Sequence, residues 1–280
     1  VVVTITGHNS TDPYDGTEHS VSGYEEEISN PLYTEADFTF SGDATVKGTD
    51  AGTYEMELKS EDFANISANF ADVKFVIVDG TLEISKRTVT MTSATDSKVY
   101  DGTALTNENV TVSGDGFVAG EGATYDVTGS QTLVGSSENT FTYTLNEGTL
   151  EENYNITTMN GILNVTDEDV DDDLVVTKSH EASEYGLGDT VTFTITATNI
   201  YQDARTITLE EIEGVTLKQA VFENVAGGET VTTTATYTIT EADILNKEFV
   251  NTVTAKVGNV VKKATDTVTA DEIDDPNGHM

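Results

Sequence analysis

The sequence predicts an all-β chain, and three observations support this fold class. Threonine, whose β-branched side chain favours strands over helices, occurs 48 times among the 280 residues. In residues 191–198, Val, Phe, Ile and Ala alternate with threonine, a period of two that is typical of a strand with one buried face. Asn-Gly and Asp-Gly pairs, which are characteristic of tight turns, separate such segments. We therefore expect tandem β-domains, with immunoglobulin-like sandwiches as the preferred architecture.

The overall composition excludes several classes of protein. The chain has 50 acidic and 13 basic side chains, a formal net charge of −37, so neither nucleic acid nor an anionic lipid surface is expected as a partner. No apolar stretch approaches the roughly 20 residues of a membrane helix, so no membrane insertion is expected in this segment. Cysteine is absent, which excludes disulfides and thiolate metal sites. A single core rarely grows past about 250 residues, so the length indicates two or three domains.

The first 166 residues contain an internal repeat. The tetrapeptide at residues 3–6 recurs at 89–92, and Tyr-Asp-Gly-Thr at 14–17 recurs at 100–103, both 86 positions later. Such self-similarity predicts two copies of one domain, at residues 1–86 and 87–166. A β-grasp fold is the alternative to a sandwich for these two copies.

Turn residues punctuate each copy. Asp79-Gly80 and Asn160-Gly161 lie between apolar segments and predict a hairpin at the end of each copy. Tyr-Asp-Gly-Thr predicts a tight turn in which the ring of Tyr14 or Tyr100 is a buried anchor. The alternative is an exposed ring that stacks on sugars.

Residues 174–270 do not match the repeat and predict a third domain. Strict alternation at 191–198, 231–239 and 249–257 indicates antiparallel strands with one buried face. A short helix is expected at residues 240–246, where Thr240 and Asp243 can form a capping box. We expect an immunoglobulin-like sandwich, joined to the second copy by the acidic linker 167–173. Residues 271–280 are expected to be a second acidic linker that ends in a tag remnant.

These motifs resemble two families of bacterial surface proteins. Residues 98–103 (Lys-Val-Tyr-Asp-Gly-Thr), followed by Asn153-Tyr154 and Asn160-Gly161, are similar to YDG/MBG-type repeats. Residues 188–193, with Thr198-Asn199 and Asn251-Thr252, resemble the conserved repeat domains that include isopeptide-forming pilin modules. The resemblance implies an extracellular, cell-wall-anchored protein in which such modules serve as stalks. Because no secretory signal or sorting motif is present, we expect a part of a longer protein, anchored through parts outside this segment.

Three polar residues, whose burial would cost free energy, fall on positions of the third domain that the alternation assigns to the apolar face. Lys178 shares the parity of Leu174 and Val176, Asn251 that of Phe249 and Val253, and Glu211 that of Ile207 and Leu209. A desolvated lysine loses its charge and becomes nucleophilic. The resemblance to pilin-like modules implies an isopeptide bond from Lys178 to Asn251, promoted by an acid between them in the chain. The usual acid is Asp, where this chain has Glu211, with Glu210 as its alternate, and a usual nearby Pro is missing. The alternative is three strand-end residues whose charged tips reach water.

The acidic runs 167–173 and 271–275 also have two interpretations. The first is a solvated, self-repelling spacer without a cofactor. The second is a calcium site, because Ca²⁺ takes six to eight oxygen ligands that clustered carboxylates can supply. Its candidate ligands are Asp167, Asp169, Asp171, Asp172 and Asp173.

Taken together, the sequence predicts a structural stalk or spacer segment of a bacterial cell-surface adhesin, monomeric, with the neighbouring domains of that protein as its partners. The alternative is an adhesion module that binds host glycan or protein directly, through loops or through exposed aromatics such as Tyr24, Tyr33 and Tyr201. An enzyme is not expected, because the four histidines share no metal-ligand spacing and no nucleotide-binding motif occurs.

Overall fold

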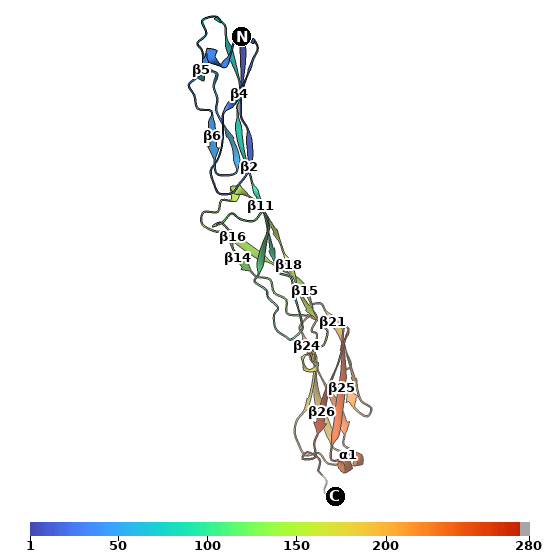
Figure 1. Cartoon of the computed structure of the whole chain (residues 1–280). Helices are drawn as coiled ribbons and strands as arrows, with labels where there is room; N and C mark the ends of the chain where they lie inside the picture. Colours follow the sequence, from blue (N-terminus) through green and yellow to red (C-terminus); the bar gives the residue numbers. More distant parts are fainter. Residues whose placement is uncertain (275–280) are drawn as a thin grey trace. The chain divides into compact units, whose positions relative to one another are not determined.

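The computed structural model describes residues 1–274, which are nearly all β (Figure 1). The single α-helix among them is α1 (Glu241–Asn246), and four short 3₁₀ turns accompany the strands. The all-β fold class predicted from the sequence is therefore confirmed. Within these residues no helix is both long enough and apolar enough to cross a membrane.

The chain forms two compact units. The first comprises Val1–Thr92, Val110–Asp126 and Thr142–Met159, and the second comprises Ser93–Asn109, Val127–Phe141 and the chain from Asn160 onward. Residues 87–166 are thus divided between the two units. The boundaries of the second copy as a separate domain stay a prediction.

The first unit contains most of the short strands. Its strands are β1 (Val2–Gly7), β2 (Ser10–Pro13), β3 (His19–Ser22), β4 (Tyr24–Ile28), β5 (Phe38–Phe40), β6 (Thr45–Gly48), β7 (Gly52–Glu55), β8 (Phe63–Asn65), β9 (Lys74–Val78), β10 (Thr81–Ser85), β11 (Arg87–Ser93), β13 (Val110–Gly114), β14 (Ala123–Val127), β16 (Phe141–Leu145) and β17 (Tyr154–Met159). They form the sheets β4-β1-β9, β2-β10-β7, β13-β11-β17, β3-β6, β5-β8 and β14-β16.

The predicted hairpins at Asp79-Gly80 and Asn160-Gly161 are wrong. β9 pairs in parallel with β1, whereas β10 pairs in parallel with β2, so the chain changes sheets at Gly80. The same change occurs at Gly161, between β17, which is parallel to β11, and β18, which is parallel to β12. A Cβ on Gly161 would lie 2.3 Å from the carbonyl oxygen of Ala94. Glycine is therefore required by a close approach of two backbones rather than by a turn.

The second unit contains the larger sheets. Its strands are β12 (Asp96–Val99), β15 (Gly135–Asn139), β18 (Gly161–Thr166), β19 (Val176–His180), β20 (Thr190–Thr198), β21 (Arg205–Glu211), β22 (Thr216–Leu217), β23 (Val221–Val225), β24 (Thr230–Thr238), β25 (Phe249–Val257) and β26 (Val260–Val268). The first three form the sheet β12-β18-β15, and the others form β19-β20-β24-β22 and β23-β21-β25-β26.

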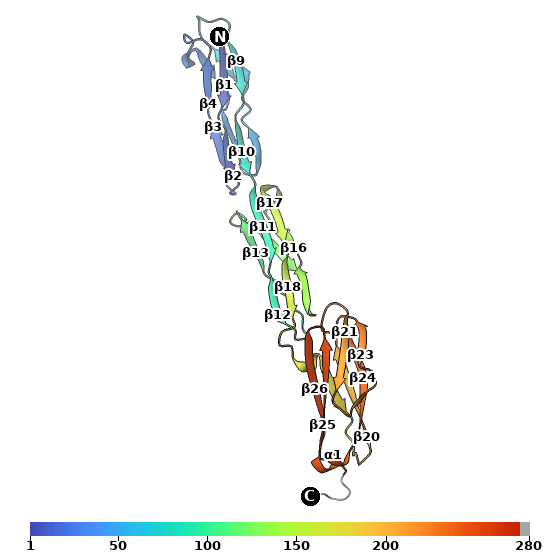
Figure 2. The same ribbon diagram turned by 90° about the vertical axis from the view of Figure 1, so that its right-hand side faces the viewer.

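The last two sheets make a β-sandwich from residues 176–268 (Figure 2). All of their strand pairs are antiparallel, and their inner faces share one apolar core that includes Phe193 and Ile195 from one sheet and Val253 and Ala255 from the other. Each of these four residues is 0% exposed. Alternation of threonine with apolar residues produces this burial, because threonine takes the outer face of each strand.

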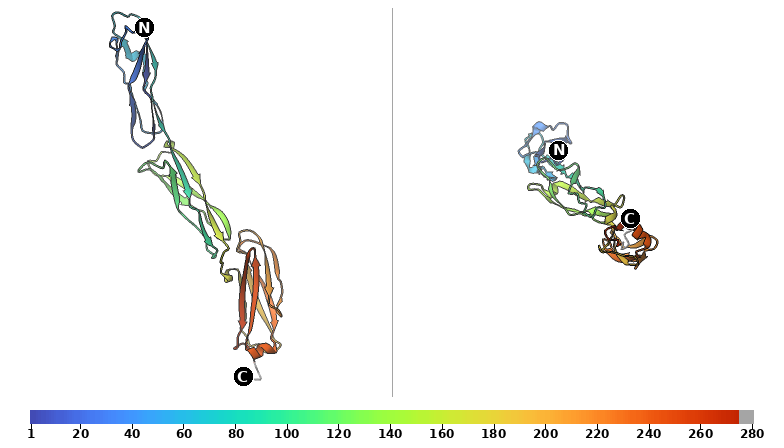
Figure 3. Two further views of the ribbon diagram at one scale, coloured as in Figure 1. Left: turned by 45° about the vertical axis from the view of Figure 1, so that its right-hand side comes forward. Right: turned by 90° about the horizontal axis from the view of Figure 1, so that it is seen from below.

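Helix α1 lies at one end of this sandwich, where the long strands stop (Figure 3). Thr240 is its N-cap, and the Thr240 and Asp243 side chains bond each other's backbone amides in a capping box. The hydroxyl of Tyr237 donates a further hydrogen bond of 2.9 Å to Asp243. The predicted helix and its cap are confirmed.

Candidate functional site

Lys178 points into the core of the sandwich. It is the third residue of β19, pairs with Ile195 of β20, and has a side chain that is 0% exposed. Its Nζ lies 5.0 Å from the centroid of the Phe193 ring. Strand parity predicted this inward orientation, and the interpretation that the charged tip reaches water does not describe Lys178.

Glu211 comes from the opposite sheet and forms an ion pair with Lys178. Oε1 of Glu211 accepts a short hydrogen bond from Nζ, and the glutamate side chain is 3% exposed. Its second oxygen, Oε2, is buried without a hydrogen-bond partner. Glu210, the neighbouring residue on β21, is exposed on the outer face. The structure therefore brings Glu211, and not Glu210, to the lysine.

Asn251 lies on the same inner face as Glu211. Glu211 pairs with Val253 in the β21–β25 register, so Asn251, two residues away on β25, is its diagonal neighbour. Diagonal neighbours in antiparallel strands are about 7–8 Å apart, within reach of long side chains. Asn251 is 0% exposed, and neither Nδ2 nor Oδ1 has a hydrogen-bond partner. An amide buried in this way costs roughly 1–3 kcal/mol for a group left unsatisfied.

Burial opposes the charge of the Lys178 amine. Burial lowers the pKa of Lys178 below its usual value, and the opposing hydrogen bond and charge of Glu211 and charge of Asp266 do not cancel this effect. A neutral amine is a nucleophile, a carboxyl group carries a proton and an amide carbon is an electrophile. Lys178, Glu211 and Asn251 supply these three groups on the buried inner faces of the sandwich.

A second cluster of charged residues adjoins this one, and the sequence analysis missed it. His180 contacts Asp266 of β26 and Glu272 with its two ring nitrogens, at 2.6 and 3.1 Å. Asp266 pairs with Asn251 in the β25–β26 register. Strand parity in the sequence could have assigned Asp266 to the inner face, because it shares the parity of Ala264 and Val268. Its contact with His180, 86 residues earlier in the chain, could not be read in this way.

The carboxylates of the run 167–173 go to separate partners. Asp167 accepts a hydrogen bond of 2.6 Å from the Tyr201 hydroxyl, and Asp172 forms an ion pair of 3.2 Å with Lys262. Val170, in the middle of the run, is buried. In the part of the chain that the structure describes, no group of three or more His, Asp or Glu side chains could hold a metal ion. Asp275 of the second run lies outside the described residues. The calcium site stays a prediction.

The two Tyr-Asp-Gly-Thr segments are tight turns with buried rings, as predicted. Tyr14 is 4% and Tyr100 is 9% exposed. In the first turn, hydrogen bonds from the Thr17 hydroxyl and amide lower the pKa of Asp15 to about 2. The hydroxyl of Tyr14 donates to Glu121, which also accepts a hydrogen bond of 2.6 Å from Tyr154. The anchor interpretation is confirmed, and the ring is not free to stack on a sugar.

The aromatic residues expected to be exposed are not. Tyr33 is 2% and Tyr201 is 5% exposed, while the half-buried Tyr24 packs edge-on against Phe40 and Phe63. The expectation that Tyr33 and Tyr201 are exposed is therefore wrong, and Tyr24 is only partly exposed. Tyrosine carries a large apolar ring, and these rings fill small cores that the sequence alone did not reveal.

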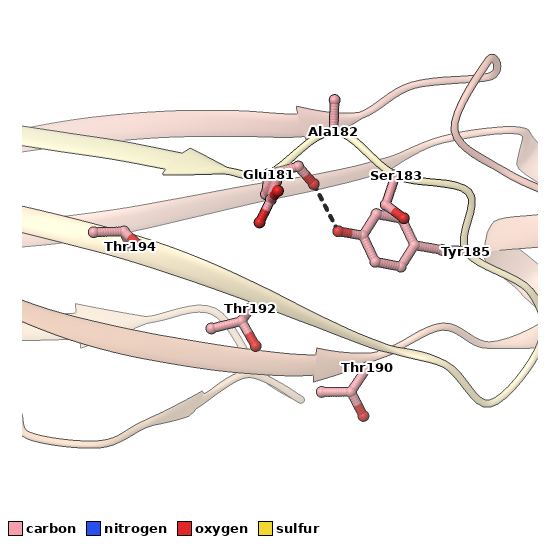
Figure 4. Close-up of a pocket in the computed structure, with 7 residues that line it drawn as sticks. All are labelled: Glu181, Ala182, Ser183, Tyr185, Thr190, Thr192 and Thr194. Carbon is pink, nitrogen blue, oxygen red and sulfur yellow. Dashed lines mark hydrogen bonds between the residues drawn. The ribbon is translucent and has the colours of Figure 1, made fainter.

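A polar depression of about 470 Å³ lies beside β20 in the second unit (Figure 4). Thr190, Thr192 and Thr194 line one side, and the loop from Glu181 to Tyr185 lines the other, with the Tyr185 hydroxyl bonded to the Glu181 carbonyl oxygen at 2.7 Å. Its lining offers the hydroxyl groups of Ser183, Tyr185 and the three threonines, together with the carboxylate of Glu181.

Comparison with known proteins gives one family match. Residues 1–86 match the MBG domain, so the first 86 residues contain a YDG/MBG-type repeat module as the sequence predicted. No curated protein matches the chain. Among solved structures, a FixG-related protein from Vibrio parahaemolyticus is 12% identical, over 36% of this chain and 97% of that chain, with a TM-score of 0.26. A likeness that slight supports no argument about function. The second repeat and the pilin-like third domain stay predictions.

Proposed function

We propose that the chain is a structural spacer segment of a bacterial cell-surface adhesin and that an isopeptide bond between Lys178 and Asn251 closes its C-terminal domain. The observation that carries the proposal is the Lys178–Glu211 ion pair, buried on the same inner face as an asparagine amide without a hydrogen-bond partner. The MBG domain at residues 1–86 supports membership of a repeat-containing protein. The resemblance of the other motifs supports the surface location.

The repeat organisation supports a spacer role. β11 is parallel to β17 in the second copy as β1 is parallel to β9 in the first, and each copy carries a buried Tyr-Asp-Gly-Thr turn. The net charge of −37 keeps such a segment soluble and opposes its collapse onto itself.

The proposed reaction uses only groups of this chain. The ammonium of Lys178 passes a proton to the carboxylate of Glu211, and the neutral amine attacks Cγ of Asn251. The protonated Glu211 donates to Oδ1 and stabilises the negative charge that develops there. The Nζ–Cγ bond forms, the Cγ–Nδ2 bond breaks, and Nδ2 leaves as ammonia with the proton that the amine gives up. The proton held by Glu211 then passes to the ammonia, which departs as ammonium. Glu211 returns to its carboxylate form, and the neutral mass of the chain falls by one ammonia.

Some buried polar atoms at this site lack hydrogen-bond partners before the reaction, and the cross-linked product accounts for them. Nδ2 of Asn251 is gone, and Oδ1 becomes the acceptor of a new amide beside Glu211. Glu211 Oε2, Asn251 Nδ2 and Asn251 Oδ1 are the buried atoms at this site that have no partner before the reaction.

Intact-protein mass spectrometry tests the proposal. The wild-type chain should weigh one ammonia less than its sequence, and Glu211→Gln, which cannot accept and return the lysine proton, should have the full sequence mass. Glu210→Gln is the matched control, because Glu210 is the adjacent carboxylate on the outer face, and it should keep the wild-type mass deficit. A wild-type chain at full mass would refute the isopeptide bond, and a full mass in Glu210→Gln alone would assign the acid to Glu210.

A further inference from the structure

His180 lies in a cluster of charged side chains next to the proposed cross-link. Its Nδ1 is 2.6 Å from Oδ2 of Asp266, its Nε2 is 3.1 Å from Oε1 of Glu272, and its side chain is 7% exposed. A ring nitrogen that faces an ionised carboxylate donates a hydrogen bond. The two contacts together therefore describe an imidazolium that carries both ring protons.

The cluster reaches the reacting groups through Asp266. Asp266 pairs with Asn251 in the β25–β26 register, and residues paired in this way place their side chains on the same face. His180 follows Lys178 by two positions on β19, so both side chains point inward. The negative charge of Asp266 favours the ammonium form of Lys178. A cation that neutralises Asp266 therefore favours the neutral amine.

We propose that His180 is a positioning residue for the cross-link: its imidazolium holds Asp266 in an ion pair and so leaves Lys178 to exchange its proton with Glu211 alone. The inference rests on the proposed isopeptide bond and adds to it a residue that does not touch the reacting atoms. It assigns a role to the buried His180–Asp266 pair, which the reaction itself does not use.

Ionisable groups from its own strand and four neighbouring segments face His180 or its partner residues. They are Asp266 from β26, Glu272 from the segment after β26, Lys178 from the same strand, Glu211 from β21 and Tyr185 from the following loop, whose ring centroid is 6.2 Å from that of His180. Hydrogen bonds from Thr269 lower the pKa of Glu272, and burial raises the pKa of Tyr185. Neither group therefore changes its charge as the pH passes through neutrality.

The pH dependence follows from the charge of His180. Burial acts to lower its pKa, but the hydrogen bond and charge of Asp266 and the charge of Glu272 outweigh burial and raise the pKa above its usual value. As pH rises through that pKa, Asp266 loses its counter-ion and stabilises the ammonium of Lys178 instead. Within the buried pair the proton passes only between Lys178 and Glu211, so a rise in the pKa of Lys178 makes the neutral amine rarer by a factor of about ten for each unit. A lysine that exchanged its proton with solvent would instead react faster as pH rises.

The test follows cross-linking during refolding of the full chain. Chain recovered unfolded in denaturant, before any cross-link has formed, is diluted into buffers from pH 5.5 to 9, and the loss of ammonia is timed by intact mass. Circular dichroism follows refolding separately. His180→Gln removes the titrating charge, and His180→Arg keeps a permanent cation. The matched control is His19→Gln, which removes a histidine that pairs with Asp15 at 3.0 Å in the first repeat.

The inference expects the wild-type rate to fall across the titration of His180, by roughly tenfold for each unit by which the pKa of Lys178 rises. His180→Gln, which carries no cation at any pH, should react more slowly than the wild type at acidic pH and match it at alkaline pH. His180→Arg should remain fast at alkaline pH, and His19→Gln should match the wild type throughout. A wild-type rate that rises steadily with pH, or a His180→Gln profile equal to the wild type, would overturn the role of His180 and leave the isopeptide bond standing. A wild-type chain that loses no ammonia at any pH would overturn both.

Discussion

Replacing Asn251 with alanine should change the stability of the sandwich differently depending on whether the isopeptide bond forms. With the bond, the substitution should lower the melting temperature, and without the bond it should leave the melting temperature unchanged or raise it. The bond closes a loop from residue 178 to residue 251, which is 73 residues of chain. By the disulfide analogy, a loop of that length removes unfolded-state entropy worth about 4 kcal/mol. For a domain of about 100 residues each kcal/mol shifts the melting temperature by about 4–8 °C, so Asn251→Ala should lower it by about 15 °C or more.

Without the bond, the same substitution should do little harm. It would remove a buried amide with two unpartnered polar atoms, a gain of roughly 1–3 kcal/mol, against the cost of a small cavity. Lys178 and Glu211 keep their ion pair in this variant, so no buried charge is left alone. Differential scanning calorimetry of the full chain is the assay, because a protein with several domains does not unfold in one transition. A melting temperature within a few degrees of wild type, or above it, would refute the reasoning, and Glu210→Gln supplies the surface control.

Four further predictions follow from the fold and the charges. Small-angle scattering should give an elongated, monomeric chain with a radius of gyration well above the ~19 Å of a compact 280-residue globule, and a compact profile would contradict the spacer role. If the acidic runs bind calcium, millimolar Ca²⁺ should raise the melting temperature through linkage, and an unchanged melting temperature would contradict the calcium site. Tyr14→Phe removes the hydrogen bond to Glu121 and should destabilise the first unit by about 1–2 kcal/mol in urea, whereas Tyr100→Phe, for which the structure shows no hydroxyl bond, should not. Because the folded pKa of His180 is raised, its stabilisation is present below about pH 6.5 and should be lost as pH rises through the folded pKa; a melting temperature of the sandwich that does not fall over this range would contradict that sign.

Strand parity in the sequence located the three inward polar residues of the site. A period of two determines the face of a side chain without knowledge of the partner strand, so Lys178, Glu211 and Asn251 could be assigned to the core. Parity also separates Glu211 from Glu210, which points outward. Register between strands cannot be read in this way, and for that reason the contact of His180 with Asp266 and Glu272 was not foreseen.

The errors of the sequence analysis have a common physical origin in long-range packing. Gly80 and Gly161 have the local chemistry of a hairpin turn, but each is required where two backbones come close as the chain changes sheets. Tyr33 and Tyr201 have no strand-like alternation around them in the sequence, yet their rings are buried and their hydroxyls are bonded to Asn65 and Asp167. Such contacts join residues more than 30 positions apart, and composition and periodicity report only on near neighbours.

Peptide mapping of the wild-type chain tests the central claim most directly. Trypsin cuts after Lys247 and Lys256, so Asn251 lies in the peptide of residues 248–256, while a lysine in an isopeptide bond at position 178 is no longer a cleavage site. The account predicts that this peptide is absent in free form and is found joined, with the loss of one ammonia, to a peptide that contains an uncut Lys178. A free peptide 248–256 at its full sequence mass, together with normal cleavage after Lys178, would contradict it.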